Sequence, residues 1–138
     1  MADNFTLEII TPERSYLIAQ AEEMVLTTAS GDLALQAHHL DLMATVLICP
    51  LVVLSNGHRN VYAISGGTLR FFHKENKAAL SVFSIESMEE IDISRALRAK
   101  ENAEELLSNS QSARESARAE VKLQRALNRI RVKNISSL

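Results

Sequence analysis

The residues best suited to binding chemistry form a basic row in the last third of the chain. The row consists of Arg114, Arg118, Lys122, Arg125 and Arg129. Steps of four, four, three and four residues place these cations on one face of an α-helix. The row has two interpretations: a solvated face stabilised by an acidic neighbouring helix, or a face that binds an acidic protein, a nucleotide or nucleic acid. Nucleic acid is the weakest of these ligands, because 15 Lys and Arg stand against 17 Asp and Glu.

Catalytic and metal-binding patterns are not found elsewhere in the sequence. The adjacent pair His38-His39 has no Cys or carboxylate cluster at ligand spacing, so we expect a solvated or interface loop and no metal site. Ser65-Gly66-Gly67 lacks the Gly and Lys of a phosphate-binding loop and precedes a strand pattern, which favours a turn or a bulge. No Ser/His/Asp or Cys/His set suggests a nucleophile. We therefore expect no catalytic residue.

Two helices are predicted to position the basic row. Residues 91–132 contain no Gly or Pro and are rich in strong helix formers. The polar segment 108–112 interrupts them and predicts a turn. Asp92 is the expected N-cap of the first helix, and Ser112 with Glu115 matches the S-x-x-E capping box of the second. The segment 89–107 is net acidic and the segment 112–138 net basic, which favours an antiparallel pair.

Small apolar residues predict the seam between these two helices. On the first helix the expected stripe is Ala96, Ala99, Ala103 and Leu106, and on the second it is Ala113, Ala117, Val121 or Leu123, Leu127 and Ile130. Small side chains let helices approach closely, but they bury little area, so packing stabilises the hairpin only modestly. We therefore expect a mobile arm.

The first 87 residues predict a β-rich body. Short alternating or apolar runs separated by turn residues indicate about eight to ten strands, at residues 5–10, 15–21, 23–28, 33–35, 42–49, 51–54, 61–64, 68–73 and 78–83. Asn56-Gly57 is the strongest hairpin signal among them. The predicted fold class is α+β: an antiparallel β-sandwich at residues 1–87, followed by a two-helix antiparallel hairpin at residues 88–138.

Compartment and membrane association can also be addressed from the sequence. The single cysteine, Cys49, excludes a disulfide framework and fits a reducing compartment. The longest apolar run, residues 42–54, contains Pro50 and is shorter than the roughly 20 residues that span a bilayer. The N-terminal residues lack the layout of a signal peptide. Membrane contact is thus expected only through a partner.

Three stretches in this order resemble a known family. Residues 6–39 are similar to its opening strands and His loop, residues 63–71 (AISGGTLRF) to its Gly-Gly hairpin, and IDISRA with RALNRIRV to the start and end of its C-terminal helices. The family is the epsilon subunit of F-type ATP synthases, termed delta in mitochondria. The family usually has Gly and Pro in the loop before its His, where this chain reads Ala34-Leu35-Gln36-Ala37-His38-His39. His39 falls on the family's His, and Asp32 stands where the family usually has Glu.

The resemblance implies a non-catalytic rotor subunit on the cytoplasmic face of the cell membrane. The sandwich would bind the gamma subunit and the c-ring, with Asp32 and His39 near that contact. The helical arm would permit turnover when folded and inhibit ATP hydrolysis when extended, its basic row meeting acidic segments of the alpha and beta subunits. The alternative is a free-standing sandwich adaptor whose basic hairpin binds an acidic protein partner.

The resemblance also implies ATP as a regulatory ligand, with no cofactor required. Some bacterial members bind ATP through an I/L-D-x-x-R-A motif, which Ile91, Asp92, Arg95 and Ala96 match here. Arg125, Arg129 and Glu86 occupy the family's other positions. Guanidinium groups pair well with phosphate oxygens. Asp92 as a simple N-cap and Arg95 as a surface charge remain the alternative.

Overall fold

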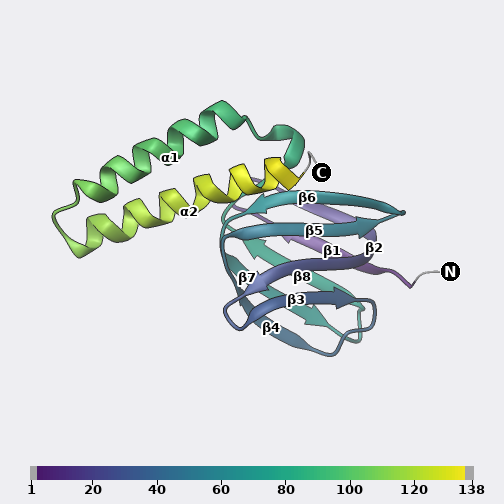
Figure 1. The fold of residues 1–138 in the computed structure, drawn as a ribbon. Helices are drawn as coiled ribbons and strands as arrows, with labels where there is room; N and C mark the ends of the chain where they lie inside the picture. Colours follow the sequence, from purple (N-terminus) through teal and green to yellow (C-terminus); the bar gives the residue numbers. More distant parts are fainter. Residues whose placement is uncertain (1–2, 136–138) are drawn as a thin grey trace. The chain divides into compact units, whose positions relative to one another are not determined.

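The computed structural model describes residues 3–135. Its internal contacts divide the chain into two compact units, Met1–Ser87 and Met88–Leu138. Strands build the first unit and helices the second, as the ribbon of Figure 1 shows. This arrangement confirms the predicted α+β class. The strands of the first unit are β1 (Phe5–Ile10), β2 (Ser15–Thr28), β3 (Gly31–Gln36), β4 (Leu42–Val46), β5 (Cys49–Ser55), β6 (His58–Ile64), β7 (Gly67–Phe72), β8 (Lys77–Val82) and β9 (Ile85–Ser87).

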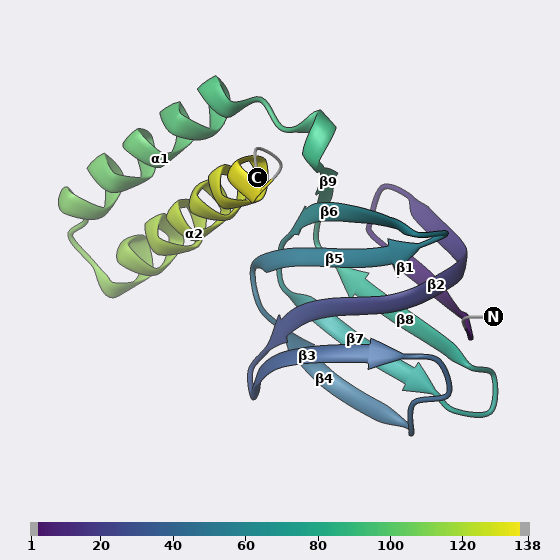
Figure 2. The same cartoon turned by 45° about the vertical axis from the view of Figure 1, so that its right-hand side comes forward.

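The long strand β2 joins the two layers of the sandwich. One layer has the order β1-β8-β7-β4, and the other consists of β3, β2, β5, β6 and β9. The first part of β2 pairs with β1, and its second part pairs with β3 and β5. In Figures 1 and 2, β2, β5 and β6 lie in front of β1, β7 and β8. Most pairs are antiparallel, as predicted, but β1 and β8 run parallel.

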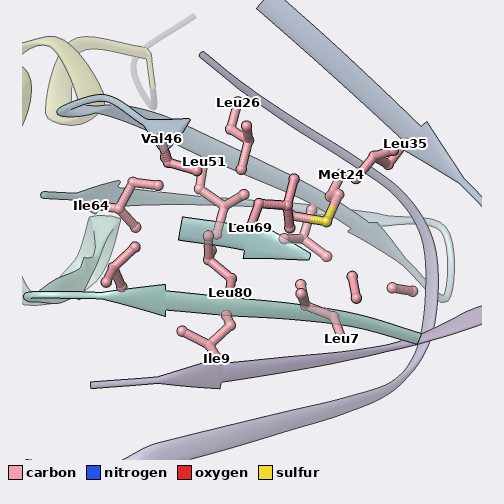
Figure 3. Close-up of a cluster of buried hydrophobic side chains, with 14 of the residues drawn as sticks. Leu7, Ile9, Met24, Leu26, Leu35, Val46, Leu51, Ile64, Leu69 and Leu80 are labelled. Carbon is pink, nitrogen blue, oxygen red and sulfur yellow. The ribbon is translucent and has the colours of Figure 1, made fainter. Parts of the chain in front are cut away.

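The core lies between the layers and consists of large aliphatic and aromatic side chains. Figure 3 draws a cluster of them, and the labelled side chains come from strands of both layers. In β1, Phe5, Leu7 and Ile9 are buried and alternate with more exposed residues, which confirms the alternation seen in the sequence. Phe5 also meets Phe71 edge to face, with 5.7 Å between the ring centroids. Each of the strands β1–β9 contributes at least one buried side chain to one continuous core.

Two predicted strand boundaries are wrong. Residues 15–21 and 23–28 form one strand, because a register shift between Ala21 and Glu23 bends β2 without ending it. The predicted break at Pro50 falls instead at residues 47–48, and Pro50 lies inside β5. The pairing of β5 with β2 extends only to Val52, so the missing N–H of Pro50 removes no bond of that ladder.

The glycine pair marks a crossing between layers. Strands β6 and β7 flank Ser65-Gly66 but do not pair with each other: β6 pairs with β5 and β9, and β7 with β4 and β8. The turn is confirmed, but the expected Gly-Gly hairpin is not. A Cβ atom on Gly67 would lie 1.8 Å from the carbonyl oxygen of Ser81, so the strands approach too closely for any other residue. The Asn56-Gly57 hairpin is confirmed, with positive φ at both residues.

The second unit is a helical hairpin whose two helices begin directly after the predicted caps, Asp92 and Ser112. A 3-10 turn, Met88–Glu90, precedes α1 (Ile93–Ser108), and α2 spans Ala113–Ile135. The carboxylate of Asp92 accepts a hydrogen bond from the N–H of Arg95 at 3.2 Å, which confirms the N-cap. Ser112 accepts from the N–H of Glu115 at 3.1 Å. The Glu115 carboxylate accepts a hydrogen bond from the N–H of Gln111 at 2.9 Å. In the standard capping box the donor is the N-cap residue itself, which here is Ser112, one residue later.

The seam between the helices differs from the predicted stripes. Ala96 and Ala103 are buried as expected, but Leu106 is 51% exposed. None of the residues predicted for the second helix is buried, and the buried ones are Ala119, Ala126, Asn128 and Val132. Close approach of two helices requires the smallest side chains at the seam. Apart from Val132, the bulkier apolar side chains of α1 and α2 are therefore partly or largely exposed.

Candidate partner-binding and nucleotide-binding surfaces

Helix α2 carries the basic row, and burial divides the row in two. Arg114, Arg118 and Lys122 are exposed, whereas Arg125 and Arg129 are half-buried. The Nε atom of Arg125 is shielded from solvent. The N-terminal half of α2 thus presents cations to solvent, and its C-terminal half holds two half-buried guanidinium groups. Arg114 and Arg118 suit a different ligand from Arg125 and Arg129, and Lys122 lies at the boundary, because it is exposed but lines a groove with the latter pair.

A groove of about 420 Å³ runs along the hairpin beside the second half of the row. Its lining comes from both helices and consists of Ala99, Asn102, Ala103, Leu106, Lys122, Arg125 and Arg129. Three of these residues are cations and none is acidic. The volume falls within the range of small-molecule sites, roughly 300–1,000 Å³. Guanidinium groups beside an amide and an apolar floor can pair with phosphate oxygens while an apolar group rests on the alanines.

The residues that match the family's I/L-D-x-x-R-A motif lie at the start of α1. Ile91 and Ala96 are buried, at the N′ and N4 positions of a hydrophobic staple. Asp92 serves as the N-cap, which uses one carboxylate oxygen. Arg95 is exposed and lines a shallow hollow of about 290 Å³ with Arg98, Ala99 and Asn102. Because Ala99 and Asn102 also line the larger groove, the two hollows adjoin on α1.

Glu86 belongs to the sandwich. It lies in β9 opposite Ala63 of β6 and is half-buried. The family resemblance predicts that it acts with the helical residues, but in the fold it is part of the other compact unit.

Asp32 and His39 lie at opposite ends of β3. Asp32 follows the first residue of the strand, and its carboxylate accepts a hydrogen bond from the Thr27 hydroxyl at 2.8 Å. His39 lies in the loop after the strand. Six residues of β-strand extend about 20 Å. The structure therefore does not bring the two predicted partner-binding residues together, and they mark two separate ends of the sandwich.

The loop that carries His39 is fixed by neighbours that sequence reasoning missed. The His39 ring meets Phe71 edge to face at 5.7 Å, and its Nδ1 atom lies 2.8 Å from the Leu40 carbonyl oxygen. Asn76 and His73 bond to the loop from the β7–β8 turn. The one sequence signal for Asn76 is its residue type, since Asn tolerates a left-handed turn conformation, and here its φ is 50°.

Residues 3–135 contain no cluster of three or more His, Cys, Asp or Glu side chains arranged to hold a metal ion. Within the same residues, neither helix is long and apolar enough to cross a membrane.

Family models match both units of the chain. The model described as "ATP synthase, Delta/Epsilon chain, beta-sandwich domain" matches residues 4–80, and "ATP synthase, Delta/Epsilon chain, long alpha-helix domain" matches residues 89–134. A protein of Levilactobacillus brevis named "ATP synthase epsilon chain" is 33% identical, over 96% of this chain and 98% of its own. One of Caldicellulosiruptor bescii with the same name is 37% identical, over 93% and 92%.

Solved structures share the fold at lower identity. A chain in the Euglena gracilis mitochondrial ATP synthase, OSCP/F1/c-ring, superposes with a TM-score of 0.80 at 18% identity, covering 97% of this chain and 81% of that one. A chain in the Tetrahymena thermophila mitochondrial ATP synthase central stalk/c-ring has a TM-score of 0.67 at 12% identity, covering 99% and 98%. The family models and the two bacterial relatives together show that the chain belongs to the epsilon-subunit family of F-type ATP synthases.

Proposed function

We propose that this chain is a non-catalytic rotor subunit, whose sandwich binds the gamma subunit and the c-ring and whose hairpin regulates ATP hydrolysis. The solved structures with the same fold are chains of an OSCP/F1/c-ring assembly and of a central stalk/c-ring assembly. Such a subunit would be a peripheral membrane protein on the cytoplasmic face, and the absence of a membrane-spanning helix within residues 3–135 is compatible with this.

The unequal construction of the two units carries the regulatory part of the proposal. The sandwich buries Phe, Leu, Ile and Met side chains, whereas four of the residues buried in the hairpin are alanines. A seam of alanines buries little apolar area, so the hairpin can open at low free-energy cost. Arg114, Arg118 and Lys122 are exposed on α2. They are suited to meet acidic segments of the alpha and beta subunits and oppose rotation when the arm is extended.

Removing the hairpin tests this proposal. A chain that lacks Met88–Leu138 retains the entire sandwich core, so we expect it to join the complex. The ATPase activity of the assembled enzyme is then expected to rise above that of the enzyme with the full chain. An unchanged ATPase activity with normal assembly contradicts the regulatory role, and loss of assembly contradicts the assignment of rotor binding to the sandwich. Recovery of no ATP synthase subunit by the full chain would favour the adaptor alternative.

The groove supports ATP as a regulatory ligand of the hairpin. Lys122, Arg125 and Arg129 line it, and Arg95 borders the adjoining hollow, so four cations are available to a triphosphate. Arg125→Ala with Arg129→Ala should abolish ATP binding in calorimetric titration. Arg114→Ala with Arg118→Ala removes the same charge from the exposed half of α2 and should leave ATP binding nearly unchanged. Equal losses of ATP affinity in the two double variants would mean that ATP binding depends only on the net charge of α2.

A further inference from the structure

The loop at residues 38–41, between β3 and β4, is held by two residues from the distant β7–β8 turn. The side-chain oxygen of Asn76 accepts a hydrogen bond from the His38 N–H at 2.6 Å. The amide nitrogen of the same side chain donates to the carbonyl oxygen of Asn4 at 2.8 Å. One asparagine side chain therefore connects the loop to the segment that precedes β1.

The bond from Asn76 lies where the loop backbone needs support. His38 has a φ of 66°, in the left-handed region that residues with a Cβ atom disfavour. A glycine adopts this conformation without that cost. Because histidine does not, a bond to its N–H helps to keep the loop in this conformation. The 2.6 Å contact with Asn76 supplies such a bond.

His73 provides a second connection to the same loop. Its backbone N–H donates to the Asp41 carboxylate at 2.8 Å. Its Nδ1 atom lies 3.2 Å from the carbonyl oxygen of His38 and 3.1 Å from that of His39. Both partners are acceptors, so Nδ1 must carry the hydrogen in this arrangement. Side chains of the β7–β8 turn thus fix both the N–H and the carbonyl groups of the loop.

The loop presents an apolar surface beside His39. Leu40 is 73% exposed, and Met43, just inside β4, is 65% exposed. The His39 ring rests on Phe71 of the core. Exposed apolar side chains on a hydrogen-bonded loop, held against a rigid sheet, are suited to a partner surface that buries them without reorganising the loop.

We propose that Asn76 and His73 are positioning residues that hold residues 38–41 in the conformation that binds the rotor. The proposal rests on the proposed function, in which the His39 region contacts that rotor. The bonds keep the free chain in the binding-competent state. Loss of a bond lowers the population of that state and weakens the apparent affinity by the same factor.

Two substitutions of Asn76 separate positioning from general stability. Asn76→Gly removes both side-chain bonds while tolerating the positive φ of residue 76. Asn76→Asp also loses the donor to Asn4, but it keeps the acceptor for the His38 N–H. The probe is the rotor subcomplex of the gamma subunit and the c-ring. For each full-length variant, the dissociation constant for this subcomplex and the melting temperature are both measured. Asn76→Gly should weaken binding about tenfold and Asn76→Asp less than twofold.

A double-mutant cycle with Leu40→Ser supplies a readout that a purely structural role would not move. Once Leu40 no longer contributes its contact, Asn76→Gly should cost less affinity than it does in the wild type. His73→Ala removes the other side-chain connection and is used if Asn76→Gly does not fold. A folded Asn76→Gly or His73→Ala variant that binds like the wild type overturns the proposal, as does equal weakening by Asn76→Gly and Asn76→Asp.

Hydrogen exchange of the free chain distinguishes failure of this proposal from failure of the proposed function. If the wild-type chain does not bind the subcomplex, the rotor assignment fails. The positioning role is then decided by the His38 amide, which should be protected in the wild type and in Asn76→Asp but unprotected in Asn76→Gly. Equal protection in all three chains overturns it.

Discussion

The sandwich and the hairpin are stabilised by different means. Phe5, Leu7, Ile9, Met24 and Leu51 are each at most 1% exposed in the sandwich. The hairpin buries chiefly alanines, and Leu97, Leu106, Val121 and Leu127 remain 37–51% exposed on its helices. Burial of apolar area scales with side-chain size, so packing contributes far more to the first unit than to the second. Local interactions must therefore supply a larger share of the stability of the hairpin.

Those local interactions are concentrated at the helix ends. Asp92 caps α1, and Ser112 with Glu115 caps α2. In the turn, the hydroxyls of Ser110 and Ser116 lie 2.6 Å apart. Each contact contributes about 1 kcal/mol or less, far below the contribution of a filled core. This difference in construction supports the proposal that a stable sandwich carries an arm that opens at low free-energy cost.

The largest effect is expected from a cavity in the sandwich. Leu7 is fully buried in β1, so Leu7→Ala should lower the free energy of unfolding by about 2–5 kcal/mol. Denaturant unfolding of the full chain, followed by circular dichroism, measures this loss. Leu17→Ala is the matched control, since Leu17 is 65% exposed, and its effect should stay below about 0.5 kcal/mol. Similar losses from the two variants would mean that the core described here is not the stabilising one.

Overpacking of the seam should affect the hairpin alone. Ala126 is fully buried, so Ala126→Leu forces the helices apart and should destabilise the hairpin by about 1–3 kcal/mol. Ala117→Leu makes the same change at an exposed position of α2 and should be nearly neutral. Amide exchange resolved by residue reports the loss on each unit. A rise in exchange throughout β5 and β8 would show that the two units unfold together.

Loss of the first cap should produce a smaller, local effect. Asp92→Ala removes the acceptor for the Arg95 N–H, and α1 should lose about 1 kcal/mol. Asp92→Asn keeps an acceptor at the same position and should retain most of that stability. Amide exchange in the first turn of α1 is the measurement. If the cap contributes nothing to stability, the Ala and Asn variants will show the same amide exchange in the first turn of α1.

The smallest effect is expected from an ion pair on the sandwich surface. Lys77 and Glu8 lie 3.2 Å apart across the parallel β1–β8 pair, and each side chain is about one-third exposed. A double-mutant cycle of Lys77→Met and Glu8→Gln should give a coupling of about 0.2–1 kcal/mol that declines with added salt. A coupling above this range would mean that charge pairs rank with the core in fixing the platform.

Local features of the fold were predictable from the sequence, whereas contacts distant in the chain were not. Strand β1, the Asn56-Gly57 turn and both helix caps depend on neighbouring residues, and all are confirmed. The continuity of β2 depends on β1, β3 and β5 pairing along its length. Periodicity within one strand does not contain that information.

The candidate sites show the same limit. Helical spacing was sufficient to group the basic row, but the division at Arg125 depends on how closely α1 approaches α2. The seam was predicted on the wrong α2 residues, because several apolar stripes fit one helical period and only packing selects among them. Asn76 lies 38 residues from His38, and nothing in the sequence links the two.

Native-state hydrogen exchange tests the separate stability of the hairpin most directly. Under mild denaturant, the free energy of opening can be measured for amides in α1 and α2 and for those in the β2, β5 and β8 core. We predict that the helical amides exchange through an opening of clearly lower free energy, while the sandwich amides exchange only through global unfolding. A single shared opening free energy for both units would contradict the account of a stable platform with a weakly held arm.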